Sequence, residues 1–205
     1  MEIILSNSEQ EKTIETPPAM HFIRQRTIFL NMVIMALIWL TSGFDYFLIM
    51  FLVNTFSRVY VTAVASSVSE LIAYPVSGVI YSYFGAKKTL AASFSLSFVG
   101  GILILLFGLR NEDSWIFVVL VIFAKFGIAC TQSIVYVAHP DIFPPLFAAS
   151  ALGYCSFLAH LFSSLSSLIS TMEEPEPIII FTCTTGFAAL LSLCLRGVIK
   201  SSHSD

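Results

Sequence analysis

Residues 115–138 read WIFVVLVIFAKFGIACTQSIVYVA, a run in which Lys125 is the one charged side chain. At a rise of about 1.5 Å per residue, a helix of this length crosses a hydrocarbon core about 30 Å thick. Hydrocarbon offers no partner to free backbone groups, so the run has to close its hydrogen bonds within a helix. It also lacks the alternating polar pattern of a barrel strand. This stretch therefore predicts a membrane-spanning α-helix.

Runs of the same kind recur along the 205 residues. Six transmembrane helices are predicted, at 28–54, 60–83, 88–109, 115–138, 146–170 and 177–197. Apolar residues make up 57% of the chain and charged residues 11%, against roughly 45–50% and 25% in average globular domains. The fold class predicted is all-α and polytopic, one six-helix bundle (28–197) in contact with the lipid bilayer. The net charge of −3 gives no basic surface for nucleic acid.

The distribution of positive charge predicts the orientation of the bundle. One group of basic residues flanks one side of the predicted spans, and these are Lys12, Arg24, Arg26, Lys87, Lys88, Arg196 and Lys200. The other side carries Arg58 and Arg110. We therefore predict that both termini are cytoplasmic, with tails at 1–27 and 198–205. The protein is predicted to be a multi-pass protein of the plasma membrane rather than of an internal membrane.

Four ionisable side chains fall inside the predicted spans, namely Asp45, Glu70, Lys125 and His160. A charge at the centre of a membrane helix costs about 2.5–3.5 kcal/mol on insertion scales, so such residues indicate a function. Three of them lie near the middle of their spans, the depth at which secondary transporters bind substrate. Asp45 lies nearer the outer end. Tyr74 lies one turn from Glu70, and Gln132 lies two turns from Lys125. With these two polar neighbours, the candidate substrate-binding residues are Glu70, Tyr74, Lys125, Gln132, His160 and Asp45.

Structural interpretations of the same residues remain open. Glu70 and Lys125 can form an ion pair that neutralises two charges without touching a substrate. His160 can be a neutral histidine bonded to a serine of a neighbouring helix. Serines follow the same face, at Ser156, Ser163, Ser164 and Ser167, and either line a water-filled cavity or let helices approach closely. Ser93, Ser97 and Gly101 form a ladder of small residues that we interpret as helix packing.

Several motifs, in order along the chain, resemble those of the organic cation/anion transporter branch of the major facilitator superfamily. The first two are Trp39-Leu40-Thr41-Ser42 followed by Tyr46-Phe47, and Glu70 with Pro75. The third, from Gly78 to Lys88, is similar to the cytoplasmic loop signature of the superfamily. The remaining ones are Ala124-Lys125-Phe126-Gly127-Ile128, then Tyr136, Asp141-Ile142-Phe143-Pro144-Pro145 and Ala151-Leu152-Gly153-Tyr154-Cys155-Ser156. The resemblance covers about residues 20–200.

The resemblance implies that this bundle is the C-terminal half of a twelve-helix carrier, with residues 1–27 as the end of the linker between halves. It also implies cytoplasmic gating motifs at Gly78, Ser82, Gly85, Lys87, Lys88, Asp141 and Pro144. The chain departs from the family pattern where Ser82 replaces an acid and Ala148 replaces a base. His160 stands where cation carriers have Asp and anion carriers have Arg, and a histidine changes charge near neutral pH.

Two functions from different classes follow. The first is transport of a small organic ion or polar solute by alternating access, with the N-terminal half supplied in the same chain or by a second half-sized chain. The second is a non-transporting scaffold or accessory subunit, which Ser82 and Ala148 favour. No enzyme activity, cofactor or metal is predicted, because the chain has no His-Glu-x-x-His, Gly-x-Ser-x-Gly or Cys-x-x-Cys pattern. The substrate and the coupling ion are not determined by the sequence.

Overall fold

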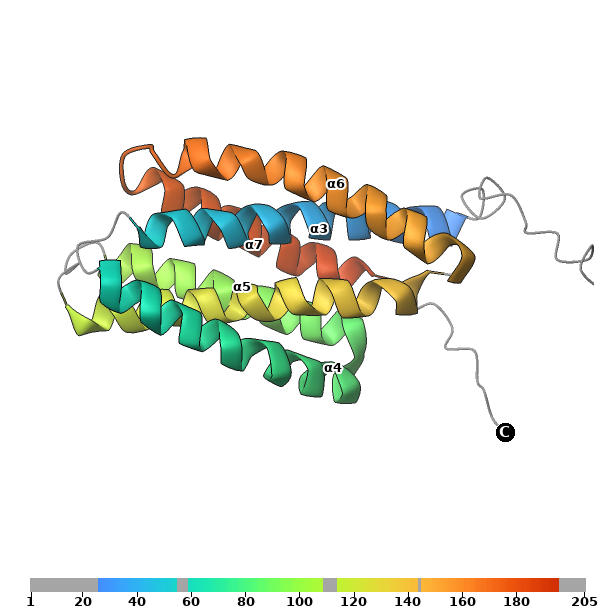
Figure 1. Ribbon diagram of the computed structural model, residues 1–205, viewed down its shortest axis with the longest axis horizontal. Coiled ribbons are helices and arrows are strands. Elements are labelled where there is room, and N and C mark those ends of the chain that lie inside the picture. The colour runs from blue at the N-terminus through green and yellow to red at the C-terminus, as the bar shows by residue number, and fades with distance from the viewer. Residues whose placement is uncertain (1–25, 55–58, 109–113, 144, 196–205) are drawn as a thin grey trace, which may run out of the picture.

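The computed structural model describes residues 26–54, 59–108, 114–143 and 145–195. Within these ranges all regular secondary structure is helical (Figure 1): α3 (Arg26–Val53), α4 (Val59–Leu103), the π-helical turn η2 (Ile104–Gly108), α5 (Trp115–Ile142), α6 (Pro145–Ile169) and α7 (Glu176–Cys194). The prediction of an all-helical fold is confirmed for these residues. The predicted tails, 1–27 and 198–205, lie outside the described residues apart from Arg26 and Thr27, which begin α3.

The prediction of six separate helices is not confirmed, because five helices of the described residues are long and apolar enough to cross a membrane. The predicted spans 60–83 and 88–109 both belong to the continuous segment Val59–Gly108. Gly85 divides this segment with non-helical angles of φ 75 and ψ 172, a region that residues with a side chain rarely adopt. The two arms of α4 on either side of Gly85 run in opposite directions (Figure 1). The sequence predicted a loop over Gly85–Lys88 between two helices, whereas in the structure Gly85 is the non-helical residue between the two arms.

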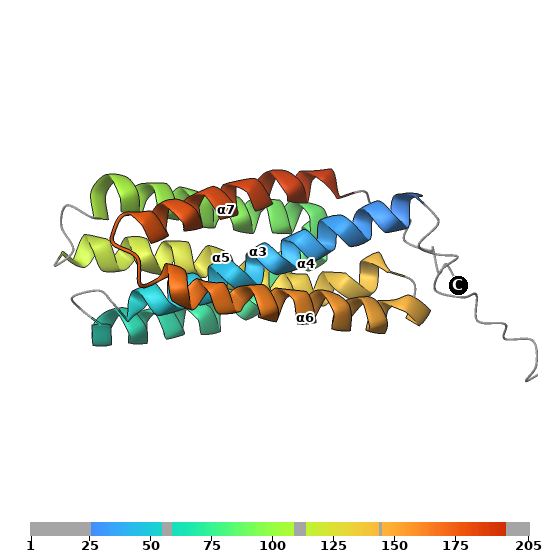
Figure 2. The ribbon, with the colours of Figure 1, turned by 90° about the horizontal axis from the view of Figure 1, so that it is seen from above.

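The helices lie side by side along the long axis of the molecule (Figures 1 and 2). Helix α6 packs mainly on α3, while α4 packs on α5 and α7. The start of α3, the kink of α4, the end of α5 and the end of α7 all lie at the same end of the bundle (Figure 1). The core between the helices holds large buried side chains, including Trp39, Phe94, Phe117 and Phe181.

Small residues bring the second arm of α4 against α5, as the serine and glycine ladder predicts. A Cβ atom on Gly127 would lie 2.6 Å from the backbone nitrogen of Ser97, and one on Gly100 would lie 2.7 Å from the Cα of Ala124. The hydroxyl of Ser97 donates to the carbonyl of Ala124 at 3.1 Å. Close backbone approach of this kind is the usual way in which membrane helices associate. It holds α5, which carries Lys125, in a fixed position relative to α4.

The start of α5 follows from local chemistry and its end from packing. The hydroxyl of Ser114 caps its first turn by accepting a hydrogen bond from the backbone N–H of Ile116 at 3.3 Å. The helix continues to Ile142, four residues beyond the predicted end at 138. His139 is buried there, with its ring centroid 6.0 Å from that of Trp39, so packing rather than polarity determines where the helix ends.

Candidate functional site

Glu70 and Lys125 come from different helices and meet inside the bundle. The Nζ of Lys125 on α5 lies 3.6 Å from the Oε2 of Glu70 on the first arm of α4. The Lys125 side chain is 3% exposed and the Glu70 side chain 19%. Lys125 lies ten residues after Trp115, the first residue of α5, which places it about 15 Å along the helix. The pair therefore lies near the middle of the helices that carry it.

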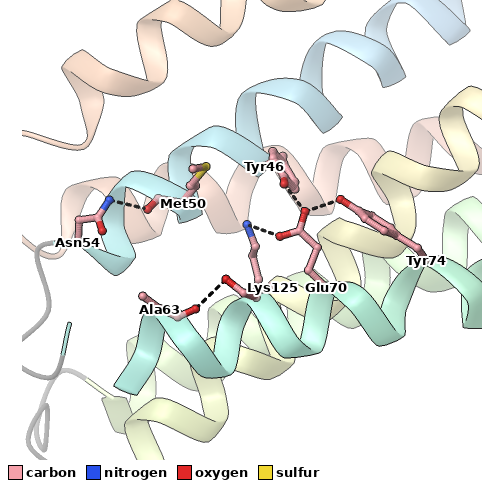
Figure 3. A network of polar contacts seen from close by, with 8 residues as sticks. Tyr46, Met50, Asn54, Ala63, Glu70, Tyr74 and Lys125 are labelled. Carbon is pink, nitrogen blue, oxygen red and sulfur yellow. Dashed lines mark hydrogen bonds and ion pairs between the residues drawn. The ribbon is translucent and has the colours of Figure 1, made fainter. Parts of the chain in front are cut away.

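Two tyrosines complete this group of side chains (Figure 3). The hydroxyl groups of Tyr46 on α3 and Tyr74 on α4 both donate to the Oε1 of Glu70. The Nζ of Lys125 also lies 4.1 Å from the centroid of the Tyr46 ring, within the range of a cation–π contact. We call Tyr46, Glu70, Tyr74 and Lys125 the polar cluster; it joins α3, α4 and α5.

The polar cluster is balanced in charge and has few open positions. Glu70 uses one oxygen for the tyrosines and the other for Lys125, and Lys125 is almost completely buried. In a medium of low dielectric constant, attraction between the two charges is strong, and neither is stable without the other. A ligand that carries charge can enter the cluster only by replacing one of these contacts. Tyr74 is the most exposed member of the cluster.

His160, which was predicted to lie at the depth of Glu70 and Lys125, is not part of the polar cluster. It lines an open cavity of about 230 Å³ between α3 and α6. The other lining residues are Phe47, Phe51, Ser163, Ser164 and Ser167. Three of the four serines that were considered with His160 therefore line the cavity with it. Phe47 connects the two places, because its ring centroid lies 5.5 Å from that of Tyr46 in the polar cluster.

The two remaining candidates for substrate binding are each engaged with another helix. The side-chain oxygen Oε1 of Gln132 on α5 accepts a hydrogen bond of 2.7 Å from the hydroxyl of Ser42 on α3. Asp45 is 0% exposed, and its Oδ1 lies 2.5 Å from the hydroxyl oxygen of Thr184 on α7. The structure thus brings Glu70, Tyr74 and Lys125 together, and it does not place Asp45 in the same cluster.

The predicted gating residues that the structure describes lie at the end of the bundle that holds the α4 kink. Beside them, the hydroxyl of Tyr81 donates to the Oδ2 of Asp141 at 2.5 Å and links α4 to α5. The hydroxyl of Ser82 donates to the carbonyl of Gly78 in its own helix at 3.0 Å. The remaining ones are Gly85 at the kink, the exposed Lys87 and Lys88, and Pro144, which lies outside the described residues.

Sequence reasoning missed Tyr46, Ser42 and Thr184 as partners of the candidate residues. A signal for Tyr46 was present: a buried phenol needs a hydrogen-bond partner, and few acceptors exist in a membrane span. Ser42 and Thr184 gave no such signal, because serine and threonine hydroxyls in membrane helices often bond to their own backbone.

Comparison with known proteins identifies relatives along most of the chain. No protein-family model matches it. The organic cation/carnitine transporter 2 of Mus musculus is 27% identical over 198 residues, which cover 93% of this chain and 35% of the relative. Solute carrier family 22 member 21 of Mus musculus is 25% identical over 196 residues, covering 92% of this chain and 34% of the relative. The human organic cation/carnitine transporter 2 is 26% identical over 164 residues, which cover 78% of this chain and 29% of the relative.

The chain is a homologue of organic cation/carnitine transporters. It spans about a third of the length of the relatives it matches. The resemblance drawn from the motifs is confirmed, and the relatives are transporters by name rather than enzymes. Five helices of the described residues are long and apolar enough to cross a bilayer, which supports a multi-pass integral membrane protein.

Proposed function

We propose that this chain is one bundle of a carrier that moves small organic ions across a membrane by alternating access, with the polar cluster in its substrate site. One observation carries the proposal: two opposite charges and two phenols from three helices meet midway along a membrane-spanning bundle. Transporter sites are found at this depth, between elements that rock against each other. In this proposal each arm of α4 crosses the membrane, so that the bundle, residues 28–197, has six crossings.

The chemistry of the polar cluster favours a substrate with both charges or with a positive charge. The names of the relatives include organic cations and carnitine, a quaternary ammonium that also carries a carboxylate. The ammonium of such a zwitterion fits the carboxylate of Glu70 and the face of Tyr46, and its carboxylate fits Lys125. Gln132 and Tyr74 supply neutral polar contacts. His160 lines the adjoining cavity and offers an imidazole as a further polar contact.

The relatives are about three times as long as the matched region, so the proposed carrier needs a second bundle. This bundle comes from the same polypeptide or from another half-sized chain. In the proposed orientation both tails, 1–27 and 198–205, are cytoplasmic, in the plasma membrane. The gating residues, including Pro144, then lie on the cytoplasmic side. There the bond between Tyr81 and Asp141 holds α4 and α5 together in the closed state.

Uptake into cells or proteoliposomes tests the proposal. The chain is expressed alone and together with the N-terminal bundle of a relative, and uptake of carnitine and of tetraethylammonium is measured. Glu70→Gln and Lys125→Met are expected to lower uptake at least tenfold, corresponding to about 1.4 kcal/mol of lost binding. Glu173→Gln, which removes an exposed carboxylate between α6 and α7, is the matched control and is expected to leave uptake unchanged. Normal uptake by both cluster variants excludes the polar cluster from the substrate site.

A second function, a non-transporting scaffold or accessory subunit, is favoured by the saturation of the polar cluster. Both oxygens of Glu70 have partners, and the Lys125 side chain is buried, as a structural ion pair requires. Within the described residues, Ser82 donates to the carbonyl of Gly78 in its own helix, so it does not replace the acid of the family signature. A scaffold predicts no substrate-dependent flux with any second bundle, together with a partner protein that co-purifies in detergent. A carrier predicts flux that depends on Glu70.

A further inference from the structure

Asp45 and its neighbour Tyr46 turn towards different helices. Successive residues of an α-helix point about 100° apart, since 3.6 residues complete one turn. Tyr46 therefore reaches Glu70 in the polar cluster, while Asp45 reaches Thr184 on α7. Asp45 is 0% exposed and is flanked on its own helix by the buried Phe44 and Leu48. It is an acid inside the packing between α3 and α7, separate from the polar cluster.

The hydrogen bonds around Thr184 do not balance if Asp45 is ionised. The hydroxyl oxygen of Thr184 lies 2.5 Å from the Oδ1 of Asp45, 2.8 Å from the carbonyl of Ile180 and 3.0 Å from the carbonyl of Phe181. A hydroxyl has one hydrogen for these three acceptors. The second carboxyl oxygen of Asp45, Oδ2, is buried and has no hydrogen-bond partner among the described residues. An ionised Asp45 would thus leave a charged oxygen without any donor, which is far more costly than a neutral one.

A proton on Asp45 balances these contacts. The carboxyl O–H then donates to the hydroxyl oxygen of Thr184, and Thr184 donates its own hydrogen to the carbonyl of Ile180 or Phe181, as threonines in helices commonly do. Each hydroxyl hydrogen then has one acceptor. The oxygen left without a partner is a neutral carbonyl rather than part of a carboxylate.

No cation of the described residues is placed to neutralise Asp45. On α5, α6 and α7, the helices with most of the contacts to α3, the charged and histidine side chains are Lys125, His139 and Asp141 on α5, His160 on α6 and Glu176 on α7. Lys125 is engaged with Glu70, the acid that α4 contributes, and Lys87 and Lys88 of α4 are exposed near its kink. His139 and Asp141 lie more than three turns beyond Lys125, His160 lines the open cavity, and Glu176 is itself acidic and exposed.

We propose that Asp45 and Thr184 form a proton-binding site between α3 and α7, occupied by a proton when these helices are packed together as observed. Loss of the proton places a charge in this packing, so release requires α3 to separate from α7 or water to enter between them. Proton occupancy thereby biases how α3 sits on α7. The inference does not depend on the chain being a carrier, and its test requires no transport.

Infrared spectroscopy of the full chain in lipid nanodiscs detects the proton directly, because a protonated carboxyl has a C=O stretch that a carboxylate lacks. At neutral pH the wild type is expected to show this band, and Asp45→Asn to lose it. Thr184→Val, which removes the partner hydroxyl, is expected to shift the band. Thr185→Val is the control, since Thr185 is the next residue of α7, is buried, and bonds to the carbonyls of Phe181 and Thr182 in its own helix. If Asp45→Asn does not fold, an unshifted band in Thr184→Val overturns the proposal.

The pH dependence of stability gives an independent test. The folded state holds the Asp45 proton at neutral pH and the unfolded state releases it near pH 4, so the folded state binds one more proton. The unfolding constant of the wild type, divided by that of Asp45→Asn, is therefore expected to rise up to tenfold per pH unit above about pH 4. Reversible denaturation in detergent micelles measures this ratio. A ratio that stays constant or falls as the pH rises shows that the folded state carries no proton on Asp45.

Discussion

Glu70→Gln keeps the size of the side chain, removes its charge, and leaves the ammonium of Lys125 without its partner. The Lys125 side chain is 3% exposed, so water cannot replace the lost carboxylate. Breaking a buried pair in this way costs about 3–5 kcal/mol. The cation–π contact with Tyr46, at 4.1 Å, remains and offsets about 0.5–2 kcal/mol of the effect on Lys125. We therefore expect the free energy of unfolding to fall by about 2–4 kcal/mol.

Substitution of the other partner of the ion pair, Lys125→Met, is expected to lower the free energy of unfolding by less. The Glu70 side chain is 19% exposed and keeps the hydrogen bonds from Tyr46 and Tyr74, each worth about 1.5–3 kcal/mol to a charged group. Its loss of stability should be about 1–2 kcal/mol. The double variant Glu70→Gln/Lys125→Met removes both charges and should be more stable than Glu70→Gln alone, because uncharged replacement of a buried pair is often neutral.

Reversible denaturation in detergent micelles measures all three variants as a double-mutant cycle. The exposed Glu173→Gln serves as the control and should change stability by less than about 0.5 kcal/mol. If the two single variants lose equal stability and their effects add in the double variant, the two charges do not depend on each other, and the reasoning from their burial is wrong.

Three further predictions concern the packing and the kink, and denaturation in micelles measures each. Gly127→Ala places a methyl group 2.6 Å from a backbone nitrogen of α4 and should cost about 1–3 kcal/mol, whereas Gly153→Ala meets nothing within 4 Å; equal effects would contradict the packing of α4 on α5. Gly85→Ala, at φ 75, should cost about 1–3 kcal/mol although no atom lies within 4 Å, and an unchanged stability would mean that the turn is not strained there. Ser42→Ala removes the hydroxyl that donates to the Oε1 of Gln132 at 2.7 Å and should lower the free energy of unfolding by about 1 kcal/mol. An unchanged stability would mean that another donor satisfies Gln132.

Only part of the candidate site could be predicted from the sequence. Glu70 and Lys125 stood out because charge is rare and costly in an apolar span, and their depth follows from counting residues along a helix. Their contact could not be derived, because spans that are apolar on nearly every side give no pattern from which to read how each helix is rotated. For the same reason, the sequence could not tell that Asp45 faces Thr184 and that His160 lines a separate cavity with Phe47.

What the sequence determined by itself is that the chain is helical and lies in a membrane, since apolar runs of this length must satisfy their own backbone hydrogen bonds in lipid. The tertiary structure decided which polar side chains meet and where the helices end. Tyr46 and Asp45 are adjacent in the chain but bond to different helices, and α5 extends to Ile142 because His139 packs in the core. Such outcomes depend on how neighbouring helices are placed around each residue, and local sequence carries no record of that placement.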